Sequence, residues 1–381
     1  MVAQLSEPRR GGGGGDEELL SKPWVREAVL WEPVEFHGKK GYVRCNLCAR
    51  RCIIAPGRYG VCGVRKNIGG KLYTLVYGLL TAMNIDPIEK KPLFHFEPGS
   101  SVLSISTVGC NFFCMFCQNW EISQSRLERG LYGKYVPPEE VVEKALEYGA
   151  DGIAYTYNEP TIFLEYVHDV AKLAKEKGLY NVMVTNGYMT PEAVDYIGPY
   201  MDGVTVDFKA SGNPDFYKRF MAVPDPSPIY DAIIAMKEKG WWIEITDLIV
   251  PRYGDKEEDV RRLARWIVEN LDPETPFHLL RFHPDYRMTN VPPTPVETLE
   301  KLAKVAQEEG LKHVFIGNVP GHPLENTYCP RCGYPVIERY GFMITAWRLD
   351  RENRCPKCGY RLKIRGRFHG GSGSIIPLLI Y

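Results

Sequence analysis

The sequence of 381 residues lacks several features that define whole classes of protein. No stretch approaches ~20 consecutive apolar residues, so we expect no membrane-spanning helix. The N-terminus is polar and glycine-rich, without the apolar segment of a secretory signal, which predicts a cytoplasmic protein. An excess of charge is also missing, because 47 Lys and Arg residues balance 47 Asp and Glu residues. There is therefore no overall basic field for nucleic acid or for a membrane surface.

Isolated cysteines are absent too, since all 11 cysteines fall into three groups. In a cytoplasmic chain such grouping indicates metal sites rather than disulfides. The groups are Cys45, Cys48, Cys52 and Cys62; Cys110, Cys114 and Cys117; and Cys329, Cys332, Cys355 and Cys358. Each group is a separate candidate site.

Composition divides the chain into segments of different character. A run of five glycines at residues 11–15 cannot bury enough surface to order itself, which predicts a flexible tail. After a glycine hinge, the apolar C-terminal tip is expected to dock on the body of the protein or on a partner. The predicted segments are the tail (1–23), an N-terminal four-cysteine segment (24–100), a large core (101–324), a C-terminal four-cysteine module (325–369) and a C-terminal tail (370–381).

The core alternates short apolar segments with amphipathic ones, which is typical of parallel strands joined by helices. We predict strands at 102–108, 152–157, 181–185, 203–208, 243–250, 277–282 and 313–316, and helices at 138–148, 161–177, 192–197, 229–239, 257–270 and 295–309. Six to seven such units predict an α/β fold with a partial (β/α)6-type TIM barrel. In such barrels the chemistry takes place at the carboxyl ends of the strands, where polar residues of this chain also fall.

The central cysteine group is a C-x3-C-x2-C run directly after the first predicted core strand. A [4Fe-4S] cluster has four irons, so three nearby thiolates leave one iron open to a small molecule. In radical chemistry that molecule is S-adenosylmethionine (SAM), which the reduced cluster cleaves. The alternatives are a zinc site completed by a distant ligand, or buried free thiols. Phenylalanines between the cysteines favour the cluster, because apolar cover shields it from water.

This run resembles the radical SAM signature C-x3-C-x-aromatic-C, with Phe116 in the aromatic position. Other stretches resemble one branch of that superfamily: Cys45-Asn-Leu-Cys-Ala-Arg-Arg-Cys, residues 57–67, the segment 86–96, Tyr-Thr-Tyr-Asn-Glu-Pro-Thr at 155–161, and Gly317-Asn-Val-Pro-Gly. The branch is the pyruvate formate-lyase-activating-enzyme-like proteins, specifically the radical SAM enzyme of the AmmeMemoRadiSam system. The resemblance covers roughly residues 40–330.

The resemblance implies a set of cofactor-binding residues: Phe116, Asn158, Glu159, Asn186, Asp207, Lys209 and His283. Asn158 and Glu159 lie where such enzymes hold the methionyl amino group of SAM. Asn186 resembles a residue near the SAM ribose and carboxylate, and His283 resembles a histidine beside the adenosyl group. Each position also has a structural alternative, as a turn residue, an ion-paired side chain or a loop histidine.

The N-terminal group has the spacing C-x2-C-x3-C-x9-C, which can bind zinc or a complete iron–sulfur cluster. A second cluster would make sense as an electron relay. Arg50, Arg51 and Arg58 add positive charge that would offset four thiolates. The sequence does not separate the two metals.

The C-terminal group contains the unit Cys-Pro-x-Cys-Gly-Tyr twice, with 22 residues between Cys332 and Cys355. Two such knuckles predict a zinc ribbon, with a rubredoxin-like iron site as the alternative. Basic residues follow at alternate positions, namely Arg361, Lys363, Arg365 and Arg367. A strand would aim them to one face, either solvated or in contact with nucleic acid or an acidic partner.

These sites predict a radical SAM enzyme that forms a 5′-deoxyadenosyl radical, which removes hydrogen from a protein or small-molecule substrate. The electron is expected from a low-potential donor, ferredoxin or flavodoxin. The resemblance implies Memo-like and AMMECR-like partners, and a tRNA substrate is the alternative. A non-catalytic electron carrier or zinc-scaffold protein is the second class. The absence of a fourth cysteine near Cys117 speaks against a carrier, which would coordinate every iron with protein.

Overall fold

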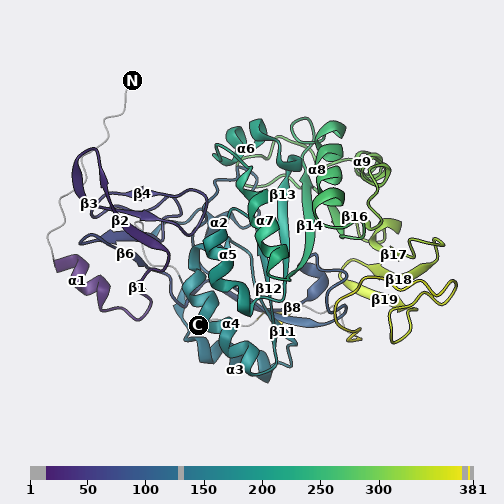
Figure 1. The fold of residues 1–381 in the computed structure, drawn as a ribbon, viewed down its shortest axis with the longest axis horizontal. Coiled ribbons are helices and arrows are strands. Elements are labelled where there is room, and N and C mark those ends of the chain that lie inside the picture. The colour runs from purple at the N-terminus through teal and green to yellow at the C-terminus, as the bar shows by residue number, and fades with distance from the viewer. Residues whose placement is uncertain (1–13, 128–132, 371–375, 378–381) are drawn as a thin grey trace.

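The computed structural model describes residues 14–127, 133–370 and 376–377. A mostly β N-terminal region and a β-rich C-terminal module lie at opposite ends of a central α/β core (Figure 1). No helix within these ranges has both the length and the apolar character to cross a membrane. The predicted tail is partly ordered, because α1 (Gly14–Leu20) is helical and Asp16 pairs with Lys66 at 2.6 Å. Residues 1–13 lie outside the described ranges.

The core contains one large sheet, whose strand order within the described residues is β16-β15-β14-β13-β12-β11-β9-β8-β20. Strands β9 and β11 to β16 run parallel, and β8 and β20 add antiparallel pairs at one edge. The strands are β8 Ala82–Pro87, β9 Ser101–Ser106, β11 Gly152–Tyr155, β12 Tyr180–Thr185, β13 Gly203–Lys209, β14 Trp242–Ile249, β15 Phe277–Arg281, β16 Val314–Gly317 and β20 Ile376–Pro377. The predicted parallel sheet is confirmed, with each predicted strand present.

Helices connect successive parallel strands, because a parallel pair needs a crossover connection and cannot be joined by a tight turn. They are α2 Trp120–Ser123, α3 Pro138–Glu147, α4 Leu164–Glu176, α5 Pro191–Ile197, α6 Pro214–Met221, α7 Pro228–Glu238, α8 Glu257–Asn270 and α9 Val296–Glu308. Helix α8 shows why they form, because Val260, Leu263, Ala264 and Ile267 repeat at helical spacing and are all buried. Helix α6 is absent from the sequence prediction, although Asn213 caps it by accepting from the Phe216 N–H at 3.1 Å.

The N-terminal region consists of short antiparallel strands with the pairing orders β2-β3-β4 and β1-β6-β5, and β7 pairs with β10. They are β1 Arg26–Glu27, β2 Trp31–Phe36, β3 Lys39–Cys45, β4 Ile53–Ile54, β5 Arg65–Ile68, β6 Lys71–Thr74, β7 Leu79–Leu80 and β10 Lys134–Tyr135. Its apolar side chains join the main hydrophobic core, so this region packs directly on the α/β core.

The C-terminal module pairs β17 (Thr327–Tyr328), β18 (Pro335–Tyr340) and β19 (Met343–Trp347) in order. Buried Arg339 fixes it to the core, since its Nη2 donates to the Phe94 carbonyl at 2.9 Å. Residues 361–367 form isolated bridges rather than a strand, and their four basic residues are exposed, as a solvated face requires. Lys363 and Arg365 also donate to Asp272 and to the Gly240 carbonyl of the core. Within the predicted C-terminal tip, residues 376–377 (β20) pair with β8, and residues 371–375 and 378–381 lie outside the described ranges.

Candidate active site and metal centres

A cavity of about 490 Å³ lies at the carboxyl ends of the parallel strands. It brings together most of the predicted site residues, although they come from separate strands: Cys110, Cys114, Cys117, Asn158, Glu159, Asn186, Asp207 and Lys209. Within the described part of the chain, no fourth cysteine lines it. Parallel register explains the gathering, because all these strands end at the same edge of the sheet.

The cysteine loop that follows β9 is held by backbone contacts. The N–H groups of Phe113 and Met115 donate to carbonyls at the end of α6, at 3.0 and 2.9 Å. Gly109 has φ +89°, and a Cβ there would lie 2.7 Å from the Cys62 carbonyl oxygen, so only glycine fits. The loop therefore passes directly against the N-terminal four-cysteine segment.

The electrostatics of this loop suit a bound cationic group. Burial raises the pKa of all three thiols, so thiolates in this position need a cation beside them. The Phe112 N–H donates to Cys110 Sγ at 3.4 Å, and Ser123 Oγ lies 3.1 Å from Cys117 Sγ. These contacts favour sulfur in its anionic form. The residues present fit a [4Fe-4S] cluster with one iron not bound by protein.

Glu159 lies at the end of β11 and is buried. Its carboxylate accepts from the Thr185 hydroxyl at 2.7 Å, from the Asn186 N–H at 2.8 Å and from the Thr161 N–H at 3.0 Å. Burial raises its pKa, while these hydrogen bonds act in the opposite direction. Glu159 therefore joins the ends of β11 and β12 at the edge of the cavity.

Two asparagines connect these strand ends to the cysteine loop. Asn158 Nδ2 donates to the Gly109 carbonyl at 2.9 Å, and Asn186 Nδ2 donates to Asn111 Oδ1 at 2.7 Å. The Asn158 Oδ1 atom is buried without a partner among the described residues, which leaves an acceptor available at the cavity. Both asparagines thus support the loop and line the cavity.

Asp207 and Lys209 form an ion pair, and Asp207 also accepts from the Thr246 hydroxyl at 2.8 Å. The ion pair expected as the structural alternative is therefore present, and both side chains also line the cavity. Two predicted residues are placed elsewhere. Phe116 is buried against Phe216 and Phe282 and does not line the cavity. His283 is exposed and does not line the cavity either.

Sequence reasoning missed a buried lysine in the cavity wall. Lys91 pairs with Asp86 at 2.6 Å and its Nζ lies 4.5 Å from the centre of the Tyr157 ring. Burial lowers the pKa of Lys91 to about 8, against the opposite effect of Asp86. The signal was the charged run Asp-Pro-Ile-Glu-Lys-Lys in a segment that otherwise reads as a buried connection.

The N-terminal cysteines line one small pocket between β3 and the cysteine loop, together with Arg50, Arg65 and Asn111. Burial raises the pKa of Cys48, and it raises the pKa of Cys62 to about 11. The four predicted ligands are therefore assembled around one point, although they come from the end of β3 and from two loops.

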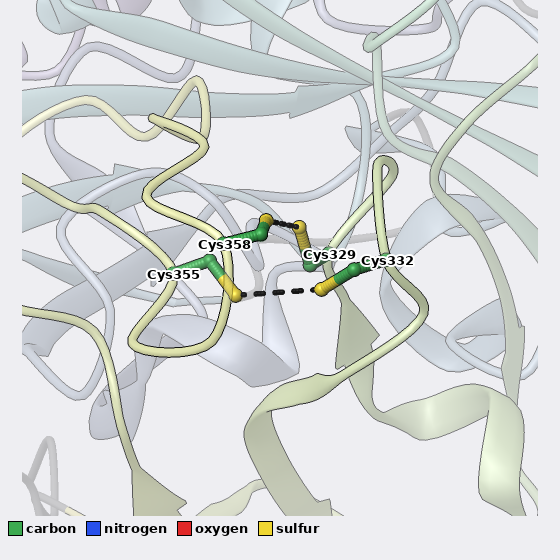
Figure 2. A group of neighbouring side chains, drawn as sticks. All are labelled: Cys329, Cys332, Cys355 and Cys358. Atoms are coloured by element: carbon green, nitrogen blue, oxygen red, sulfur yellow. Dashed lines mark hydrogen bonds between the residues drawn. The ribbon is translucent and has the colours of Figure 1, made fainter.

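The C-terminal cysteines lie on two facing knuckles (Figure 2). Cys329 Sγ is 3.5 Å from Cys358 Sγ, and Cys332 Sγ is 3.7 Å from Cys355 Sγ. A tetrahedral zinc with Zn–S bonds of about 2.3 Å places its sulfurs about 3.8 Å apart. Although burial opposes it, backbone N–H groups of the knuckle lower the pKa of Cys355 to about 7. The four thiols fit a single metal ion.

Comparison with known proteins gives the class. The family model described as the radical SAM superfamily matches residues 104–267. An uncharacterized protein of Methanocaldococcus jannaschii is 46% identical over 341 residues, which cover 89% of this chain and 99% of that one. The chain belongs to the radical SAM superfamily.

More distant relatives include the pyruvate formate-lyase 1-activating enzyme of Escherichia coli K12. It is 22% identical over 226 residues, covering 54% of this chain and 89% of that enzyme. Among solved structures, a domain of a pyruvate-formate lyase-activating enzyme from Bacteroides vulgatus aligns with a TM-score of 0.39 and 19% identity. That alignment covers 44% of this chain and all of the domain.

Proposed function

We propose that this protein is a radical SAM enzyme of the pyruvate formate-lyase-activating-enzyme-like branch, and specifically the enzyme of the AmmeMemoRadiSam system. The observation that carries the enzymatic function is the cavity, where three thiols and no fourth meet the polar ends of several parallel strands. When bound, the reduced [4Fe-4S] cluster supplies the electron that cleaves SAM to methionine and a 5′-deoxyadenosyl radical. The family match and the distant activating-enzyme relatives support this function.

The chain's own residues would bind and orient SAM. Cys110, Cys114 and Cys117 hold the cluster, and the unpartnered Asn158 Oδ1 can accept from the methionyl ammonium. Glu159 keeps Asn186 and its neighbours at the cavity edge through its hydrogen bonds.

We further propose the supporting architecture. The parallel sheet forms a partial (β/α)6-type TIM barrel, and the C-terminal module is a zinc ribbon. The predicted segments are separate structural units. The radical would remove hydrogen from a protein or small-molecule substrate above the strand ends. A ferredoxin or flavodoxin in the cytoplasm would supply the electron, with Memo-like and AMMECR-like proteins as partners.

The test is the formation of 5′-deoxyadenosine by the anaerobically reconstituted, dithionite-reduced protein supplied with SAM. Cys114→Ala is expected to abolish it, because the cluster loses one of its three protein ligands. Met115→Leu serves as the matched control in the same loop, since Met115 does not line the cavity. Equal production of 5′-deoxyadenosine by Cys114→Ala and the unaltered protein would refute the assignment.

A further inference from the structure

The N-terminal cysteine pocket and the C-terminal ribbon differ in the spacing of their sulfur atoms. Among the described residues, only the ribbon brings three or more candidate ligand atoms within 4.8 Å of one another. The four N-terminal thiols therefore surround their pocket more widely than one tetrahedral ion requires. The triad at Cys110 shares this wider spacing. In a cubane cluster each thiolate binds a different iron, so its sulfurs stand farther apart than those around a single ion.

Three residues that line the same pocket carry buried donors without partners in the described structure. Arg50 Nη2, Arg65 Nε and Asn111 Nδ2 are each buried without a hydrogen-bond partner in the described structure, and all three residues line the pocket. Leaving such donors unpaired is costly, and most of all for a guanidinium. Arg65 already pairs with buried Glu165, whose Oε2 also lacks a partner, so the case for an additional acceptor at the pocket rests on Arg50 and Asn111.

A cluster meets this requirement better than zinc. Inorganic sulfides at the corners of a cubane can accept from the unpaired N–H groups, whereas a zinc ion offers no acceptor of its own. Arg65 already directs Nη1 to Cys45 Sγ at 3.9 Å. Arg50 adds positive charge beside the four thiolates, whereas the charge of buried Arg65 is balanced by its ion pair with Glu165.

The pocket lies next to the active-site cluster loop. Asn111 directly follows Cys110, and its carbonyl accepts from Arg50 Nε at 3.0 Å. The Cys62 carbonyl also lies against Gly109 on the same loop. A continuous path of bonds and one hydrogen bond thus joins the two cysteine sites.

We propose that Cys45, Cys48, Cys52 and Cys62 bind a second [4Fe-4S] cluster, coordinated on every iron by protein, which relays electrons to the cluster at Cys110. One electron enters from a low-potential ferredoxin or flavodoxin and reduces this cluster, and the same electron then leaves for the neighbouring cluster. No bond forms or breaks in the relay step. The relay rests on the proposed function, whereas the identity of the bound group does not.

The identity is tested in a variant with Cys110, Cys114 and Cys117 all replaced by alanine. After anaerobic reconstitution with iron and sulfide, this variant is expected to retain about four irons and four sulfides. Reduction should give an EPR signal that SAM does not alter. Zinc without sulfide at this site, or no retained iron, overturns the proposal. Failure of the proposed function would appear separately, as absence of SAM cleavage in the unaltered protein.

Substitutions at two adjacent arginines test the contribution of Arg50 to the second cluster. Arg50→Gln removes a positive charge and N–H donors beside the pocket, so the reduction potential of the second cluster should fall. Arg51→Gln is the matched control, because Arg51 is exposed and pairs with Glu192 at 2.8 Å. Ferredoxin-driven SAM cleavage should fall at least about tenfold relative to dithionite-driven cleavage in Arg50→Gln only. Equal potentials and equal ratios in the two variants would contradict the relay.

Discussion

At the scale of single residues, Glu159 shows how the structure changes the meaning of a predicted site residue. The sequence places it as a carboxylate for the methionyl ammonium of SAM, and that contact stays a prediction. In the structure both its oxygens already accept hydrogen bonds, from Thr185 and Asn186 among others. Its main effect is therefore on the position of two strand ends.

Replacing Glu159 with glutamine should destabilise the protein. The glutamine NH2 group would face the buried N–H and O–H donors that now bind the carboxylate. We expect the free energy of unfolding to fall by about 1–3 kcal/mol. Denaturant titration measures this, with Glu147→Gln as the control, since Glu147 is an exposed partner of Lys144. An unchanged unfolding free energy in Glu159→Gln would show that the hydrogen bonds are dispensable.

At the scale of elements, the C-terminal four-cysteine module is a local motif that is attached to the core. Its knuckles bring four thiols together without help from the core, and β18 carries Arg339 into the core. Closed coordination by four thiolates leaves no open position for a substrate. The metal site of the module is therefore expected to be structural, although Gly341 and Phe342 of the β18–β19 turn line the cavity.

Cys355→Ser should release the metal of the ribbon, because one of four thiolates is lost. We expect zinc content to fall from about one per chain toward zero and the melting temperature to fall by several degrees. Visible absorbance of the clusters should persist. Arg354→Gln, an exposed neighbour, is the control. Loss of cluster absorbance in a folded Cys355→Ser protein would contradict this separation.

At the scale of the whole molecule, His369 joins distant segments near the end of the chain. Its ring nitrogens lie 3.0 Å from Asp151 and 2.7 Å from Glu97, which belong to the core and to the segment before it. Hydrogen bonds to Asp151 and Glu97 raise the pKa of His369 to about 9. The protonated ring thus ties the C-terminal module to the sheet.

This tie makes stability depend on pH. Because the pKa is raised on folding, the stabilisation is complete below about pH 6.5 and is lost as pH rises through about 9. His369→Gln should lower the free energy of unfolding by on the order of 2 kcal/mol near pH 6 and by little near pH 10. Unfolding titrations across that range measure the difference. His37→Gln, on the exposed β2–β3 turn, should show no such trend, and a gap in His369→Gln that is constant with pH would contradict the argument.

The sequence by itself determined the parallel sheet and the three cysteine groups. Alternation of apolar strands with amphipathic helices predicted every parallel strand of the core sheet, because burial on both faces leaves a clear local pattern, whereas the antiparallel edge strands β8 and β20 were not predicted. The two knuckles of the ribbon were equally local. The eight-residue helix α6 was missed, although its capping asparagine was present.

The tertiary structure alone decided what surrounds each cysteine group. Arg50, Arg65 and Asn111 are distant in sequence, and only folding brings their unpaired donors to one pocket. Tertiary folding likewise places Lys91 in the cavity wall and His283 outside it. Spacing along the chain fixes which residues can meet locally, whereas burial, hydrogen-bond partners and the distances between sulfurs depend on contacts between separate segments.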